Sequence, residues 1–160
     1  IRRQRQMCIR DRVEEAQKVW GQGVVKIGKL KDNGDQCESF ASDFLNKLYA
    51  FDFGTVLFKP TKCAHEQFRP SKSQALSYFI AGEDRECIED KGFAINPWTE
   101  VRFENSNFIF AKERAIAMGN YFFTDLNGIE AKVEYTFGYK LVGTELRIDL
   151  HHSSFPYNPS

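Results

Sequence analysis

Apolar residues change their spacing near Pro97, from the period of a helix to the period of a strand. Three segments before Pro97 have apolar residues every three to four positions, at 13–27, 40–48 and 75–80. Asp35 and Ser71 each stand three residues before a Glu or a Gln, which is the spacing of a helix-capping box. The first half of the chain therefore predicts three helices, with a short strand at 54–59 between the second and the third.

After Pro97 the pattern becomes that of long strands. We expect strands at 98–104, 108–111, 114–124, 131–139 and 144–152. Asn127-Gly128 predicts a tight hairpin turn, and 105–107 is expected to join the first two strands. Helices followed by an antiparallel meander indicate a single α+β domain. A strongly curved sheet wrapped over one long helix would leave a concave pocket.

The last strand ends in a run of polar side chains, HHSS at 151–154, which Pro156 follows closely. Adjacent residues of a strand point to opposite faces, so His151 and Ser153 should share one side, and His152 and Ser154 the other. Four consecutive hydrogen-bonding side chains at the end of an apolar strand indicate a functional site. The alternative is a set of satisfied polar groups that close the sheet.

The first residues look foreign to the rest of the chain. The run RRQRQMCIRD at 2–11 matches the translation of a common transposase sequencing adapter, as read-through in an assembled environmental sequence would produce. We therefore expect residues 1–12 to be a disordered artefact and residues 13–160 to form the single domain. The alternative is a basic tail that binds nucleic acid or an anionic membrane surface.

Composition narrows the class of protein. Without the four arginines and one aspartate of 2–11, the 22 basic and 22 acidic residues become a net charge of about −3, and no basic stripe suggests a nucleic-acid partner. No apolar run approaches the ~20 residues of a membrane span. Cys37, Cys63 and Cys87 form no metal knuckle, although one pair could form a disulfide. No compartment is predicted, because a signal or transit peptide ahead of residue 13 would be missing here.

Four segments together carry a resemblance to a known family. They read FKPTKCA at 58–64, QFRP with ALSYF at 67–79, GFAINPW at 92–98 and HHSSFP at 151–156. These segments resemble the iota-class carbonic anhydrases over residues 40–157, and the HHSS-x-P ending is the most specific element. The family is related to the association domains of calcium/calmodulin-dependent protein kinases. The resemblance implies their cone-shaped α+β fold, that of the nuclear transport factor 2 superfamily.

The resemblance also implies an activity, the reversible hydration of carbon dioxide to bicarbonate. In metal-free members of the family, a threonine, a tyrosine and a serine hold bicarbonate through their hydroxyls. The matching positions are Thr61, Tyr78 and Ser153, with Ser154 as the alternative serine. No cofactor is expected, and zinc or manganese is the alternative, since some family members are described as metal-dependent.

Catalysis of hydration also needs an acceptor for a water proton. An unperturbed imidazole, with a pKa near 6.5, accepts a proton more readily than a phenol, so His151 or His152 is the candidate acceptor. A three-histidine zinc site with His65 is the competing interpretation, but adjacent histidines on a strand point apart.

Two other functions remain compatible with the sequence. One is a non-catalytic ligand-binding or assembly module, like the kinase association domains. The other is a pocket isomerase or dehydratase, for which Asp149 and Glu134 would be weak carboxylate candidates. Aromatic residues occur on both faces of the strand that holds Tyr121, Phe122 and Phe123, so we also expect a homodimer formed through the outer face of the sheet.

Overall fold

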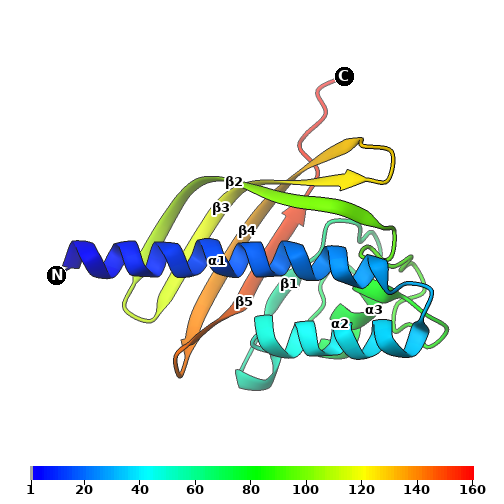
Figure 1. Ribbon diagram of the computed structural model, residues 1–160, viewed down its shortest axis with the longest axis horizontal. Helices are drawn as coiled ribbons and strands as arrows, with labels where there is room; N and C mark the ends of the chain where they lie inside the picture. Colours follow the sequence, from blue (N-terminus) through cyan, green and yellow to red (C-terminus); the bar gives the residue numbers. More distant parts are fainter. Residues whose placement is uncertain (1) are drawn as a thin grey trace.

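The computed structural model describes residues 2–160, with side chains from Ile9 onward, as three helices packed on one face of a curved sheet (Figure 1). The helices are α1 (Arg2–Lys29), α2 (Gly34–Leu48) and α3 (Lys72–Ile80), with a short 3-10 turn at Phe51–Phe53. The strands are β1 (Leu57–Lys59), β2 (Trp98–Ala111), β3 (Arg114–Asp125), β4 (Glu130–Val142) and β5 (Glu145–Ser154). The predicted α+β class and the order of helices before a meander are confirmed.

The sheet has the order β1-β5-β4-β3-β2. Neighbours are antiparallel except for β1, which pairs in parallel with β5. Figure 1 shows α1 lying across the sheet, while α2 and α3 lie near the C-terminal end of α1. No helix in residues 2–160 is both long and apolar enough to cross a membrane.

Helix α1 starts earlier than the sequence suggested. It begins at Arg2 and so includes residues that were expected to be disordered. The first Gly of the segment is Gly21, and no Pro interrupts it, so the helical hydrogen bonds can continue across residues 2–20. The foreign origin of residues 1–12 stays a prediction.

Strand β2 is a single strand, whereas two strands joined by 105–107 were expected. The chain accommodates the polar segment as a bulge, where the register with β3 shifts between Asn105 and Asn107. Gly119 lies opposite the bulge, and a Cβ there would come 2.2 Å from the carbonyl oxygen of Glu104. Only glycine therefore allows β3 to approach β2 this closely.

An aromatic core lies between α1 and the sheet, with Trp20 of α1 at its centre. Trp20 is 1% exposed. Seven rings have centroids 5.5 to 6.4 Å from it: those of Phe44, Phe79, Phe103, Tyr121, Phe123, Phe137 and His151. The imidazole of His151 and the phenol of Tyr121 are thus among the rings packed around Trp20, and such buried polar groups need hydrogen-bond partners.

Candidate active site

Strand β5 ends with His151 and Ser153 facing the core and with His152 and Ser154 facing away, as the alternation predicted. His151 is 3% exposed and Ser153 is 1% exposed, whereas His152 is exposed and Ser154 is half-buried. Of the two candidate serines, only Ser153 reaches the interior.

A β-bulge contributes to this orientation. The register of β4 with β5 shifts between Gly138 and Tyr139. Ile148 before the shift and His151 after it are both buried, although they are three residues apart. The predicted alternation therefore holds on either side of the bulge but not across it.

Four hydroxyl groups gather at the buried end of β5. The Thr61 Oγ1 and Ser153 Oγ atoms are 2.6 Å apart. The Tyr121 hydroxyl of β3 donates to Ser153 Oγ at 2.6 Å. The Tyr78 hydroxyl of α3 accepts the backbone N–H of Lys62, the residue after Thr61, at 3.1 Å. The structure thus brings together the three hydroxyl residues that the resemblance implied, and it adds Tyr121; we call these four residues the hydroxyl cluster.

The pairing of β1 with β5 positions Thr61. Lys59 lies opposite His152 in the parallel register, and its ammonium group donates to the carbonyl oxygen of Ser153 at 2.8 Å. Pro60 then fixes the backbone φ angle between the strand and Thr61. These contacts bring Thr61 beside a residue that is distant in the sequence.

A buried ion pair anchors the segment around Tyr78. Arg69 donates from both terminal nitrogens to the Asp90 carboxylate, at 2.9 and 2.7 Å, and both side chains are fully buried. Ser77, the neighbour of Tyr78 on α3, donates to the same carboxylate at 2.5 Å. The predicted capping box at Ser71 starts this helix. The loops on either side of α3 are therefore held to it, which fixes the position of Tyr78.

His151 is buried next to the hydroxyl cluster and uses both of its ring nitrogens. Its Nδ1 is 2.8 Å from the Tyr49 hydroxyl, and its Nε2 is 3.1 Å from the Tyr121 hydroxyl. The ring stacks on Phe58, with the centroids 4.8 Å apart. Burial, with a smaller contribution from His152, lowers the pKa of His151 well below its ordinary value of 6.5. The imidazole is therefore neutral at physiological pH, and neither nitrogen is free to take a water proton.

The two tyrosines of the cluster keep their protons. Burial raises the pKa of Tyr78 and of Tyr121 well above the ordinary value of 10.0. Both groups are therefore hydrogen-bond donors across the physiological pH range, which suits a site that binds an oxyanion.

The remaining candidates lie elsewhere. Ser154 donates to Glu134 at 3.3 Å on the outer face of the sheet. His65 is exposed, in a loop whose backbone N–H groups at 64–66 donate to Glu89. The structure does not bring His65, His151 and His152 together. Among the side chains it describes, no group of three or more His, Cys, Asp or Glu residues could hold a metal ion, and Cys37, Cys63 and Cys87 are free thiols.

A cavity of about 600 Å³ opens beside the cluster. It is lined by Tyr78 and Lys62, by Glu89 and Asp90 and by residues 91–93, 95 and 96. The two carboxylates already have partners. Glu89 accepts three backbone N–H groups, and Asp90 pairs with Arg69. Thr61 is half-buried, so the cluster is not sealed from solvent.

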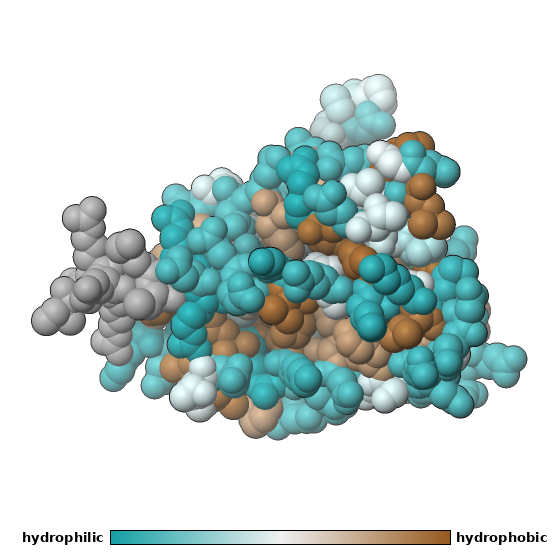
Figure 2. Space-filling view, viewed as in Figure 1, coloured by the Kyte–Doolittle hydropathy of each residue, from teal (hydrophilic) through white to brown (hydrophobic). Residues whose placement is uncertain are grey.

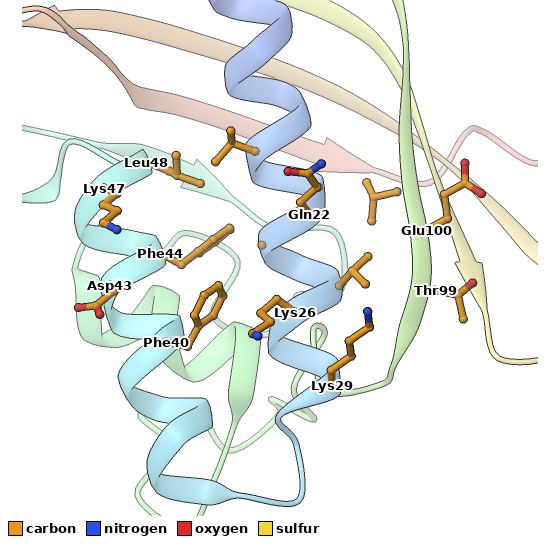
Figure 3. A pocket seen from close by; sticks show the side chains of 15 residues that line it. Gln22, Lys26, Lys29, Phe40, Asp43, Phe44, Lys47, Leu48, Thr99 and Glu100 are labelled. Atoms are coloured by element: carbon orange, nitrogen blue, oxygen red, sulfur yellow. The ribbon is translucent and has the colours of Figure 1, made fainter.

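A second hollow lies between α1 and α2 (Figure 3). It has a volume of about 610 Å³, with Phe40, Phe44 and Leu48 on its α2 side and lysines such as Lys26 and Lys29 at its rim. Figure 2, viewed as in Figure 1, shows hydrophobic residues exposed beside α1. No member of the hydroxyl cluster lines this groove, so it is not the candidate active site.

Tyr121 and Tyr49 were missed as site residues. Tyr121 had been considered only for a dimer face, but its side chain points inward and is 1% exposed. Strand alternation alone indicates that Tyr121 and Phe123 point to the same face of the sheet. Only the fold reveals that its hydroxyl meets Ser153.

Comparison with known proteins places this chain among the carbonic anhydrases. A sequence model of the family described as metal-independent carbonic anhydrase matches residues 11–155. The chain belongs to this family, whose members hydrate carbon dioxide reversibly to bicarbonate. A metal-independent carbonic anhydrase of Nostoc sp. is 37% identical over 146 residues, which cover 89% of this chain and 71% of that protein.

Solved structures agree. A cyanobacterial iota-carbonic anhydrase, determined in complex with bicarbonate, superposes with a TM-score of 0.88 at 36% identity and covers 92% of each chain. A protein of Xanthomonas campestris, described as a calcium/calmodulin dependent protein kinase II association domain, has a TM-score of 0.57 at 23% identity, over 87% of this chain and 81% of that one. A dehydratase-like protein of Streptomyces avermitilis has a TM-score of 0.59 at 11% identity, over 92% and 96%. The last two show the shared fold, that of the nuclear transport factor 2 superfamily, and confirm that prediction.

Proposed function

We propose that this carbonic anhydrase binds carbon dioxide and bicarbonate at the hydroxyl cluster, where Thr61, Tyr78, Tyr121 and Ser153 take the place that a metal ion has in zinc enzymes. The observation that supports this most directly is the contact between Thr61 and Ser153, whose hydroxyl oxygens are 2.6 Å apart although they come from distant parts of the chain. The cyanobacterial relative of the same fold was determined in complex with bicarbonate, which supports an anion site in this protein.

The chemistry of hydration suits hydroxyl donors. As the oxygen of water bonds to the carbon of carbon dioxide, negative charge grows on the carbon dioxide oxygens. Donors that are already oriented stabilise that charge without reorganisation, and their effect is larger in a site from which water is excluded. Tyr78 lines the cavity and Thr61 is the least buried member of the cluster, so these two residues carry this role. Tyr121 and Ser153 lie behind Thr61 and hold its hydroxyl in place.

The proton of the attacking water leaves on the cavity side. His151 has no free nitrogen, and His152 is exposed beyond the sheet, so neither candidate imidazole is within the cluster to accept it. We assign this role to buffer that enters the 600 Å³ cavity. The hydration rate should then rise with buffer concentration until another step limits turnover.

Thr61→Val tests the assignment, because valine keeps the shape of threonine and removes only the hydroxyl. We expect stopped-flow hydration to slow by about a hundredfold, the usual effect of losing one oriented donor. Thr55→Val, at an exposed threonine, is the matched control. Equal rates for Thr61→Val and the wild-type protein would refute the assignment.

We also propose that two copies pair through the outer face of the sheet. Phe122 points outward, but the Arg102 guanidinium covers it, with its central carbon 4.0 Å from the ring centroid. Two apolar side chains of β3 and β2, Met118 and Ile109, remain uncovered and are 57% and 66% exposed. A second copy would bury this surface. Light scattering should give a dimer for the wild-type protein and a monomer for Met118→Glu; a wild-type monomer at micromolar concentration would refute the pairing.

A further inference from the structure

The hydrogen bonds of the hydroxyl cluster continue into the core as one chain. Beyond Tyr121 they pass through His151 to Tyr49, and Trp20 Nε1 donates to the Tyr49 hydroxyl at 3.0 Å. Each of these four side chains is at most 3% exposed. The whole chain has six members in the order Trp20, Tyr49, His151, Tyr121, Ser153 and Thr61.

The buried end gives this chain a direction. An indole N–H can only donate, so the Tyr49 oxygen accepts from Trp20. The proton of Tyr49 then needs an acceptor, because a buried donor without one is costly. Among the residues whose side chains the structure describes, His151 Nδ1 is the one acceptor that its hydroxyl contacts. Tyr49 therefore donates to Nδ1, and Nδ1 carries no proton.

The direction then passes outward one member at a time. A neutral imidazole with a bare Nδ1 has its proton on Nε2, so His151 donates to the Tyr121 oxygen. Tyr121 donates in turn to Ser153 Oγ. Ser153 has one hydroxyl proton, which it donates to Thr61 Oγ1 at 2.6 Å. Thr61, the half-buried last member, is left with a hydroxyl proton that no inner member accepts.

We infer that Trp20, Tyr49 and His151 are positioning residues that fix the direction of this chain, so that Thr61 offers its O–H outward to the substrate. The inference rests on the proposed function, since it takes Thr61 as part of the active site. It also explains why the site offers hydrogen-bond donors: the cause lies in Trp20, Tyr49 and His151, which are outside the cluster. An outward O–H suits the charge that develops on a carbon dioxide oxygen and on bicarbonate.

The same chain cannot carry the water proton away. Its inner end is an indole that has no acceptor site, inside the aromatic core. A proton that entered at Thr61 would have to leave by the same route. The chain therefore orients the donors, and the proton released in hydration leaves toward the cavity.

Nitrogen NMR measures the direction without reference to activity. In a His65→Gln/His152→Gln protein, His151 is the remaining imidazole, and its two ring nitrogens can be assigned from proton–nitrogen correlations. We expect a neutral ring with the proton on Nε2 at every pH where the protein is folded. A proton on Nδ1, or a mixture of the two tautomers, overturns the inference.

Tyr49→Phe connects the direction to catalysis. The substitution keeps the ring and removes the O–H that occupies Nδ1, so the proton of His151 should distribute between both nitrogens. The kcat of hydration should fall about tenfold with little change in KM, since one hydrogen bond of ordinary net strength is worth about that factor. Tyr139→Phe is the matched control, because Tyr139 is equally buried and its hydroxyl has no partner among the described residues.

The two measurements separate the possible failures. A Tyr49→Phe protein that keeps the wild-type tautomer or the wild-type kcat overturns the inference, provided that Tyr139→Phe behaves as the wild-type protein does. If the wild-type protein does not hydrate carbon dioxide at all, the proposed function fails, whereas the tautomer of His151 still decides whether the chain has the stated direction.

Discussion

The hydroxyl oxygens of Thr61 and Ser153 lie 2.6 Å apart, although 92 residues separate them in the sequence. The parallel pairing of β1 with β5 creates this contact, because it aligns Lys59 with His152 two residues before Thr61. A shift of one residue in that register would turn Ser153 away from Thr61 and replace it with a residue of the outer face. The proposed active site therefore depends on a pairing of three residues at the edge of the sheet.

The two serines at the end of β5 give the sharpest test of this geometry. Ser153→Ala removes the hydroxyl between Tyr121 and Thr61, and we expect hydration to slow by about a hundredfold. Ser154→Ala, which affects only the contact with Glu134 on the outer face, should retain the wild-type rate. Stopped-flow assays of both variants make the comparison, and a larger loss in Ser154→Ala would contradict it.

Tyr78→Phe should reduce the hydration rate by a similar factor, about a hundredfold. The Lys62 backbone N–H loses its acceptor at the same time, so the thermal midpoint of the variant should be recorded with its rate. Because burial raises the pKa of Tyr78 and Tyr121, we expect no loss of wild-type activity from tyrosine ionisation up to about pH 10, the ordinary pKa of the group. A decline in hydration activity with a midpoint near pH 9, present in the wild-type protein and absent in Tyr78→Phe, would show that Tyr78 ionises below its ordinary pKa.

Removing Arg69 should destabilise the whole domain. Arg69→Met leaves the buried Asp90 carboxylate without its ionic partner, which typically costs about 3–5 kcal/mol in the free energy of unfolding. Lys31→Met breaks an ion pair whose side chains are 40% and 91% exposed, and it should cost less than about 1 kcal/mol. Urea unfolding gives both values. Similar stabilities for the two variants would show that the Arg69–Asp90 pair does not anchor α3.

Glu89 should make the loop beside the cavity sensitive to acid. Three backbone N–H groups at 64–66 donate to its carboxylate, and mainly for that reason its pKa falls from 4.5 to about 2. A carboxylate with a lowered pKa contributes stability above its unfolded value, so the contribution is complete above about pH 4.5 and is lost as the pH falls toward 2. In Glu89→Gln that pH dependence should be absent from the loop, which amide exchange at Ala64, His65 and Glu66 can show. Equal pH dependence in both proteins would exclude Glu89 as its source.

The sequence predicted the outline of this fold because the outline is encoded locally. The apolar period changes near Pro97, and the capping box at Ser71 and the turn at Asn127-Gly128 mark element ends, each within a few residues. Strand alternation also predicted that His151 and Ser153 lie on one face of the sheet and that His152 and Ser154 lie on the other. The bulges opposite Gly119 and at Gly138 did not, because they depend on the partner strand.

The deeper part of the site could not be predicted, for a different reason. Tyr49, Tyr121 and Trp20 occupy ordinary core positions in the apolar pattern. That pattern does not show whether a buried aromatic side chain also makes a hydrogen bond. Their connection to His151 spans distant segments, with sequence separations of 102 and 30 residues for the two contacts of the imidazole. Such contacts exist only after the tertiary structure has formed.

The central claim is that the hydroxyl cluster catalyses hydration without a metal ion, and one measurement tests it most directly. The protein is treated exhaustively with a chelator, its residual metal is determined by mass spectrometry, and its carbon dioxide hydration is followed by stopped flow. We expect full activity at far less than one metal ion per chain, and no increase when zinc or manganese is added. Loss of hydration on chelation, with recovery on adding zinc, would contradict the claim.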